Sequence, residues 1–216
     1  MVSVRFEAVR RAFLARERTW GPDPSERVAW HRGRERYAVW VVRLDDRAVV
    51  ARAASLAASL GATIRPVEPR DLHVTVHVAG FPSDSPHHDD DVSWATLEAQ
   101  AASLAEVPAG TISVGGANSF ATAAFLEVED HGVLAAVRSA LGSHHEELRF
   151  APFDPHLTVG TYLDAWPISE VASRLAAPDA LLRISVTQVH LITFDAQRPG
   201  ASLRTERVVL LQGVSS

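Results

Sequence analysis

Two short stretches decide the fold: Asp71-Leu72-His73-Val74-Thr75-Val76-His77-Val78-Ala79-Gly80 and Phe153-Asp154-Pro155-His156-Leu157-Thr158-Val159. Each stretch carries a His-x-Thr triplet among apolar residues, and each triplet follows a turn that contains proline. Alternating apolar and polar residues with many β-branched side chains are typical of strands. Because alternate side chains of a strand share a face, each stretch presents an imidazole and a hydroxyl on one face, with apolar side chains on the other.

The elements around the first stretch recur around the second, so the architecture is duplicated. The pattern predicts a strand pair or one long strand in 63–79, further strands at 37–44, 111–114, 123–128, 155–161, 181–194 and 205–211, and helices at 2–18, 45–60, 92–106, 131–148 and 168–176. A Gly-Gly-Ala-Asn turn is expected at 115–118, and a loop at 82–91. The sequence therefore predicts an α+β, bilobal fold, in which two antiparallel-rich sheets flank a central cleft and each lobe carries one His-x-Thr strand.

The chain of 216 residues suits one domain of this kind. We expect residues 1–36 to form an N-terminal helix and a turn-rich connector, and residues 37–216 to form the bilobal domain. No signal peptide and no apolar run of membrane length is evident, so we expect a cytoplasmic protein that does not bind membranes. We also expect a monomer.

Composition excludes several classes of function. The chain has no cysteine, which excludes disulfide frameworks and thiolate metal sites. Its net charge of −5 argues against a broad, sequence-independent binder of nucleic acid, which would be basic. All 21 cationic side chains are arginine, and their number alone identifies no site.

The two His-x-Thr faces predict a phosphoesterase site made of His73, Thr75, His156 and Thr158. If the two faces oppose one another across a cleft, two imidazoles and two hydroxyls surround one tetrahedral group. Two histidines can share the roles of general base and general acid near neutral pH without a metal. The threonine hydroxyls can donate to the non-bridging oxygens, where negative charge develops in the transition state.

The same stretches resemble the two motifs of the two-histidine (2H) phosphoesterase superfamily, and in particular its bacterial 2'-5' RNA ligase-like proteins, the RNA 2',3'-cyclic phosphodiesterases. The resemblance covers residues 37–211. It implies hydrolysis of a cyclic phosphodiester, such as the 2',3'-cyclic phosphate of a nucleotide or RNA end, or of a 2'-5' linkage, with no cofactor. By analogy His73 is the acid for the leaving oxygen and His156 the base for water.

Four further residues are candidates for binding the substrate. Many relatives place an arginine three residues after the second motif threonine, where this chain has Thr161. Arg43, or an arginine of the N-terminal segment, is the expected replacement. Phe81 and Tyr162, near the ends of central strands, are candidates for stacking on a base, although each also suits the core, as does Trp40. His77 is expected on the face of His73, where it either lines the cleft or serves as a supporting or satisfied core histidine.

Two alternatives remain open. The chain could be a nucleotide or RNA-end binding module of the same fold without catalysis. It could also be a metal-dependent hydrolase that uses His73, His77 and the run His87-His88-Asp89-Asp90-Asp91. Consecutive ligand-type residues cannot all converge on one ion, so we expect no metal. Intact histidine and threonine in both motifs favour an enzyme over a binding module.

Overall fold

The computed structural model describes residues 4–145, 147, 153–176, 180–198, 200 and 202–213. The strands of this part of the chain are β1 (Arg36–Arg43), β2 (Ile64–Pro66), β3 (His73–Ser83), β4 (Asp91–Ser93), β5 (Gly110–Ser119), β6 (Ala123–Asp130), β7 (His156–Tyr162), β8 (Leu182–Val186), β9 (Gln188–Asp195) and β10 (Arg204–Leu210). Its helices are α1 (Val4–Leu14), α2 (Pro24–His31), α3 (Arg47–Leu60), α4 (Trp94–Leu104), α5 (Val133–Gly142) and α6 (Ile168–Arg174), with 3₁₀ turns at Gly61–Thr63 and Pro69–Asp71. This mixture of helices with a large antiparallel sheet confirms the α+β class.

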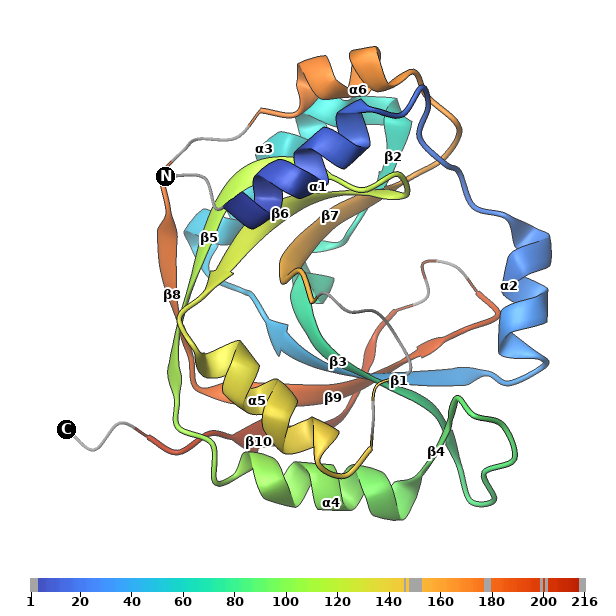
Figure 1. Cartoon of the computed structure of the whole chain (residues 1–216), viewed down its shortest axis with the longest axis vertical. Helices are drawn as coiled ribbons and strands as arrows, with labels where there is room; N and C mark the ends of the chain where they lie inside the picture. The colour runs from blue at the N-terminus through green and yellow to red at the C-terminus, as the bar shows by residue number, and fades with distance from the viewer. Residues whose placement is uncertain are drawn as a thin grey trace.

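The strands form one curled sheet in the order β10-β9-β1-β3-β7-β6-β5-β8, with β2 paired to β7 and β4 to β3 (Figure 1). Each half of this order has one His-x-Thr strand at its inner edge. The halves are joined where Val74 of β3 pairs with Leu157 of β7, antiparallel. The two motif strands are therefore neighbours at the middle of the sheet.

One face of the sheet carries the main core. Val74, Leu157 and Trp40 are fully buried there, together with residues of helices α3, α4, α5 and α6. In α3 the buried residues recur at the spacing of a single helical face, Val49, Ala53, Leu56 and Leu60. The side chain of Asp46 accepts from the amides of Ala48 and Val49 and so caps the start of this helix.

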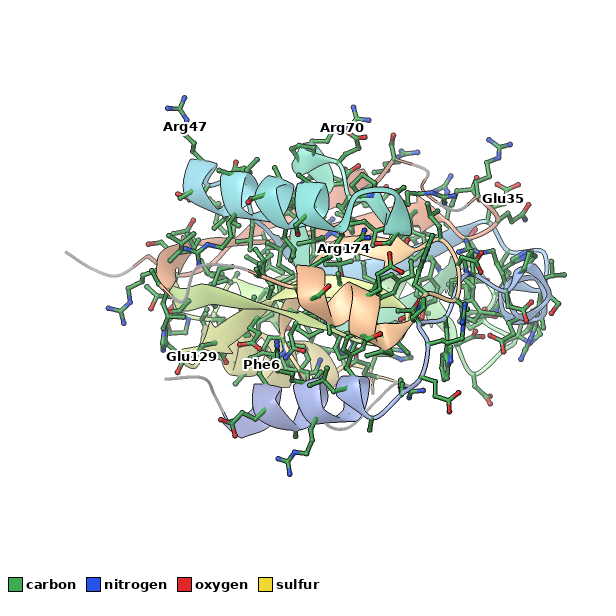
Figure 2. The ribbon with its side chains drawn as sticks, turned by 90° about the horizontal axis from the view of Figure 1, so that it is seen from above. Phe6, Glu35, Arg47, Arg70, Glu129 and Arg174 are labelled. Atoms are coloured by element: carbon green, nitrogen blue, oxygen red, sulfur yellow. The ribbon has the colours of Figure 1, made fainter. Side chains whose placement is uncertain are left out.

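The N-terminal segment packs mainly on the opposite face, which is also the face of the motif histidines, although Phe13 of α1 joins the main core. Phe6 of α1 packs on Phe125 of β6, and its carbonyl accepts from the Asn118 side chain. Figure 2 shows α1 and α3 on opposite sides of the sheet, with Phe6 directed toward it. On the other half, Trp30 of α2 packs edge-on against Tyr37, with ring centroids 4.7 Å apart. Residues 4–31 therefore cover parts of the site face in both halves.

Several predicted elements differ in detail. The first helix ends at Leu14 rather than at residue 18, and a second helix, α2, begins within the expected connector. Gly115 and Gly116 do not form a turn: they lie inside β5, where its ladder with β6 shifts register between Val114 and Ala117. The expected strand at 181–194 is two strands, β8 and β9. No helix among the described residues is long and apolar enough to span a membrane.

Candidate active site

The register of the two central strands places the four motif side chains on one face. Val74 and Leu157 pair directly and both point into the core. In an antiparallel ladder the neighbours of such a pair point to the other face, which sets His73 opposite Thr158 and Thr75 opposite His156. Directly opposed Cβ atoms in such ladders are about 5 Å apart and diagonal neighbours about 7–8 Å apart. Proximity of the two histidines also shows in their electrostatics, since His156 contributes to lowering the pKa of His73.

Both imidazoles are held by the same local contact. Nδ1 of His73 lies 2.6 Å from the carbonyl oxygen of Asp71, and Nδ1 of His156 lies 2.7 Å from that of Asp154. A carbonyl only accepts, so Nδ1 carries the hydrogen in each ring. This contact fixes the tautomer and leaves Nε2 of each ring as the atom that gains or loses a proton.

Burial lowers the pKa of both histidines. At His73 the desolvation is opposed by the carbonyl and carboxylate of Asp71 and reinforced by the charge of Arg43. At His156 it is opposed by the carbonyl and carboxylate of Asp154. Both rings are therefore mainly neutral at pH 7, and an anion bound between them favours protonation of one.

A cavity of about 540 Å³ opens beside the first motif. Its lining includes His73, Thr75 and Thr161. Apolar side chains of β1, β3, β9 and the β9–β10 connection line it as well, together with three arginines and three acids: Tyr37, Val39, Val78, Ile192, Phe194, Leu203, Arg27, Arg65, Arg198, Glu68, Asp71 and Asp195. His156 lies outside this lining, with its ring edge-on to Phe120 at 4.9 Å and tilted to Phe125 at 5.2 Å.

A bulge follows the threonine of each motif. In the ladder of β1 with β3, Val41 pairs with Thr75 but Trp40 pairs with His77, so Val76 is an extra residue. In the ladder of β6 with β7, Phe125 pairs with Thr158 and Ala124 with Gly160, so Val159 is the extra residue. Each bulge shifts the alternation of side chains by one position beyond the motif.

The bulge makes the expected position of His77 wrong. His77 points to the core face and is 2% exposed, with Nε2 3.4 Å from the Gln100 amide nitrogen. Burial, with the charges of Arg138 and His145, lowers its pKa to about 4. His77 is thus a neutral core residue, away from the cavity.

The two aromatic candidates are also buried, and neither lines the cavity. Phe81 is 1% exposed and packs on Trp30 and Tyr37, with the Arg34 guanidinium 3.6 Å from its ring centroid. Tyr162 is 2% exposed. Its hydroxyl lies 2.6 Å from that of Ser119, and burial raises its pKa to about 12. Of the two interpretations that the sequence allowed for these rings, the structure favours the core.

Arg43 lies beside His73, its partner in the ladder of β1 with β3. Its guanidinium donates to the carbonyl of Arg70 and, at 3.2 Å, to the hydroxyl of Thr205, and it lies 3.8 Å from Asp71. Arg43 is therefore held on the site face by protein groups, close enough to His73 to lower its pKa.

Sequence reasoning missed Arg65. In the ladder of β2 with β7, Arg65 pairs with Thr161 and so shares its face of the sheet. Strand β2 falls within the strand pair expected in 63–79, but it is only three residues long and ends in a proline, so its period-2 pattern was too short to place Arg65 on a face.

Sequence reasoning also missed a support for the first bulge. Arg138 donates to the carbonyl of Val76 at 2.5 Å, and Glu147 accepts from the amide of Val78 at 2.8 Å. These two side chains form an ion pair at 2.6 Å. The pair satisfies backbone groups that the bulge removes from the regular ladder.

The acidic run at 89–91 has a structural partner. Asp90 and Asp91 both accept from Arg34, at 2.6 and 2.5 Å, and Asp91 also accepts from the amides of His87 and His88. In the part of the chain that the structure describes, no three histidine or acidic side chains gather as a metal site would require.

Solved structures with the same fold come from several bacteria. TT0787 of Thermus thermophilus is 17% identical, with a TM-score of 0.61 over 82% of this chain and 98% of its own. Escherichia coli LigT complexed with 3'-AMP is 15% identical, with a TM-score of 0.56 over 83% of this chain and 99% of its own. A conserved protein of Agrobacterium tumefaciens is 15% identical, with a TM-score of 0.52, and its match covers 97% of this chain and 99% of its own.

A search of curated protein sequences finds no match. The family model of the 2'-5' RNA ligase superfamily matches residues 44–198, a span that contains both His-x-Thr strands and all the elements between them in the sequence. The resemblance drawn from the two motifs is thereby confirmed: the chain belongs to the 2'-5' RNA ligase superfamily of two-histidine phosphoesterases.

Proposed function

We propose that this chain is a metal-independent phosphoesterase that opens a 2',3'-cyclic phosphate on a nucleotide or RNA end, or cleaves a 2'-5' linkage. One observation carries the proposal. The ladder pair of Val74 and Leu157 sets two imidazoles and two threonine hydroxyls on one face, and each imidazole is anchored through Nδ1.

The chemistry requires two proton transfers, one at each Nε2. One neutral imidazole takes a proton from water, which attacks phosphorus, and the bond from phosphorus to the 3' oxygen breaks. The other imidazole, protonated, gives its proton to that oxygen, and the product is a 2'-phosphate. Thr75 and Thr158 donate to the non-bridging oxygens as charge develops on them.

Two arguments disagree on which histidine is the general acid and which is the general base. The family resemblance makes His73 the acid. The charge of Arg43, however, disfavours a protonated His73, while the Asp154 carboxylate favours a protonated His156. A substrate with a p-nitrophenolate leaving group, which needs no protonation, decides between them: the variant that lacks the acid keeps most of its activity on this substrate, and the variant that lacks the base does not.

The test of the function is a substrate panel that is run with a chelator, without it, and with a divalent metal added back. It contains 2',3'-cyclic mononucleotides, an RNA with a cyclic-phosphate end, a 2'-5' dinucleotide and ADP-ribose cyclic phosphate. We expect turnover of at least the cyclic phosphates, unaffected by the chelator. Binding without turnover would instead favour the nucleotide-binding module, and activity restored only by zinc or manganese would favour the metal hydrolase.

Nucleotides are the ligand class to test first, because the related LigT has been crystallised with 3'-AMP, with NADP+ and with ATP. The monomeric state and the cytoplasmic location stay predictions from the sequence.

A further inference from the structure

The cavity is larger than a single phosphate between two histidines requires. Its volume of about 540 Å³ lies in the range of pockets that enclose whole small ligands. His73 lines the cavity at the level of Arg43, its partner in the ladder of β1 with β3, whereas Tyr37 lines it six positions earlier on β1 and Phe194 lines it from β9. A substrate whose scissile phosphate lies at His73 therefore has the rest of the cavity for its other groups.

The three arginines of the lining differ in what already binds them. Arg198 lies 3.5 Å from the carboxylate of Asp195, and Arg27 donates to the carbonyl of Ala196 at 3.2 Å. The Arg65 side chain has neither a hydrogen bond nor an ion pair to any residue that the structure describes. Among these three cations, Arg65 is the one that the described protein leaves free for a ligand.

Arg65 lies beyond the scissile centre. Its partner Thr161 is two ladder steps from Thr158, since Phe125 pairs with Thr158 and Ala123 with Thr161. Two steps correspond to about 7 Å along the strand. The Arg65 side chain reaches Gly200 in the β9–β10 connection. Nη1 of Arg65 lies 3.7 Å from the position that a Cβ atom on Gly200 would occupy. The cation that acts on His73 is Arg43 instead.

We propose that Arg65 binds a second anionic group of the substrate, a phosphate other than the one that is cleaved. This inference rests on the proposed function. The preferred substrate then has a 2',3'-cyclic phosphate at one end of a nucleoside and a phosphate on its 5' oxygen. That second phosphate belongs to a 5'-phosphorylated mononucleotide or to the preceding linkage of an RNA strand, and both present the same anionic oxygens to a guanidinium.

The test compares three substrates: adenosine 2',3'-cyclic phosphate, the same nucleotide with a 5'-phosphate, and a dinucleotide that ends in the cyclic phosphate. In the wild-type protein we expect at least one of the two additional phosphates to raise kcat/KM about tenfold, as a charge-assisted contact does. Arg65→Ala should abolish this gain, so that the three substrates have similar kcat/KM, while Arg65→Lys should keep part of it. A gain from the 5'-phosphate would identify a 5'-phosphorylated mononucleotide as the source of the second anion, and a gain from the dinucleotide would identify an RNA strand.

Arg47→Ala is the matched control, because it removes the same charge from a side chain that extends away from the molecule at the start of α3 (Figure 2). It should leave the gain intact. The inference is overturned if neither additional phosphate raises kcat/KM in the wild-type protein, or if Arg65→Ala lowers kcat/KM equally for all three substrates.

A binding experiment separates this inference from the proposed catalysis. By calorimetry, adenosine 2',5'-bisphosphate should bind more tightly than adenosine 2'-monophosphate, and Arg65→Ala should remove the difference. If no cyclic phosphate is hydrolysed but this difference is found, the second anion site stands and the catalytic proposal fails. If the wild-type protein does not discriminate between the two ligands, the second anion site is wrong.

Discussion

At the scale of single residues, the two histidines are equivalent in what holds them. Each follows an aspartate by two positions, and its Nδ1 donates to the carbonyl of that aspartate. The two groups are only two positions apart in the sequence, so the contact does not depend on what the strand packs against. It leaves both Nε2 atoms to gain or lose the proton, and in the proposed reaction the surrounding charges decide which ring is the acid and which is the base.

Replacing either histidine should therefore impair turnover strongly. We expect His73→Ala and His156→Ala each to lower kcat about 10²–10⁴-fold, the effect of removing a general acid or base. The double variant should lose much less than the product of the two, because the histidines act as a unit. Steady-state kinetics on a cyclic nucleotide measure this.

The control is His144→Ala, which removes an exposed imidazole after α5 and should leave kcat unchanged. Full activity in either motif variant would refute the two-histidine assignment.

The pH dependence follows from the same two rings. The proposed reaction needs one neutral and one protonated imidazole, so kcat/KM should be bell-shaped, with limbs that belong to the coupled pair. Burial lowers both pKa values, which favours loss of the proton from the acid and shifts the bell toward acid. We therefore expect the optimum of kcat/KM below pH 7, falling as pH rises because the acid is deprotonated. A profile that rises steadily through pH 8 would contradict this.

At the scale of elements, the bulge after each motif threonine decides which side chains belong to the site. Without the bulge at Val76, the period of a strand would carry His77 to the face of His73. With it, His77 faces Gln100 in the core, and its ring nitrogen is positioned to accept from the Gln100 amide. That amide oxygen accepts from Trp40 Nε1 at 2.8 Å.

Burying His77 in its neutral form makes stability depend on pH. Its folded pKa is about 4 against an ordinary value of 6.5, so the unfolded chain binds the proton first as pH falls. The free energy of unfolding should fall between pH 6.5 and pH 4, by at most about 3 kcal/mol from this residue. His77→Leu should remove that part of the fall, measured by urea unfolding at about pH 4.5 and about pH 7.

The other histidines with lowered pKa act in the same direction, so the comparison of the variant with the wild-type protein isolates His77. His144→Leu is the control and should leave the pH dependence as it is. Equal pH dependence in wild type and His77→Leu would show that His77 gains its proton in the folded protein.

At the scale of the whole molecule, the two halves share one sheet and one main core, and the N-terminal segment packs against both. Phe13 of α1 belongs to that core although the match to the family model begins at residue 44. Trp30 of α2 belongs with Tyr37 and Phe81 on the other face. These contacts predict that residues 4–31 fold as part of the domain rather than as an appendage.

A pair of adjacent residues tests this. Phe13 is 2% exposed and Leu14 is 48% exposed. Phe13→Ala should lower the free energy of unfolding by about 3–5 kcal/mol, the usual cost of replacing a buried phenylalanine with alanine. Leu14→Ala should lower it by much less. Denaturant unfolding of the two variants measures the difference. Equal, small effects would mean that α1 contributes little to the fold.

The class of the fold and the four residues of the proposed site follow from the sequence. Period-2 alternation is a local property of a strand, and it places His73 with Thr75 and His156 with Thr158 whatever the strand packs against. The duplicated pattern of strands and helices was equally local, and it led to the α+β fold and to the superfamily.

Which residues surround those four depends on how the strands meet in the folded chain. His77 turned to the core because a bulge, visible only in the ladder with β1, breaks the alternation. Arg65 reached the cavity because β2 pairs with β7, a strand about a hundred positions away in the chain. Such pairings depend on which strands meet, and no pattern within a single stretch carries that information.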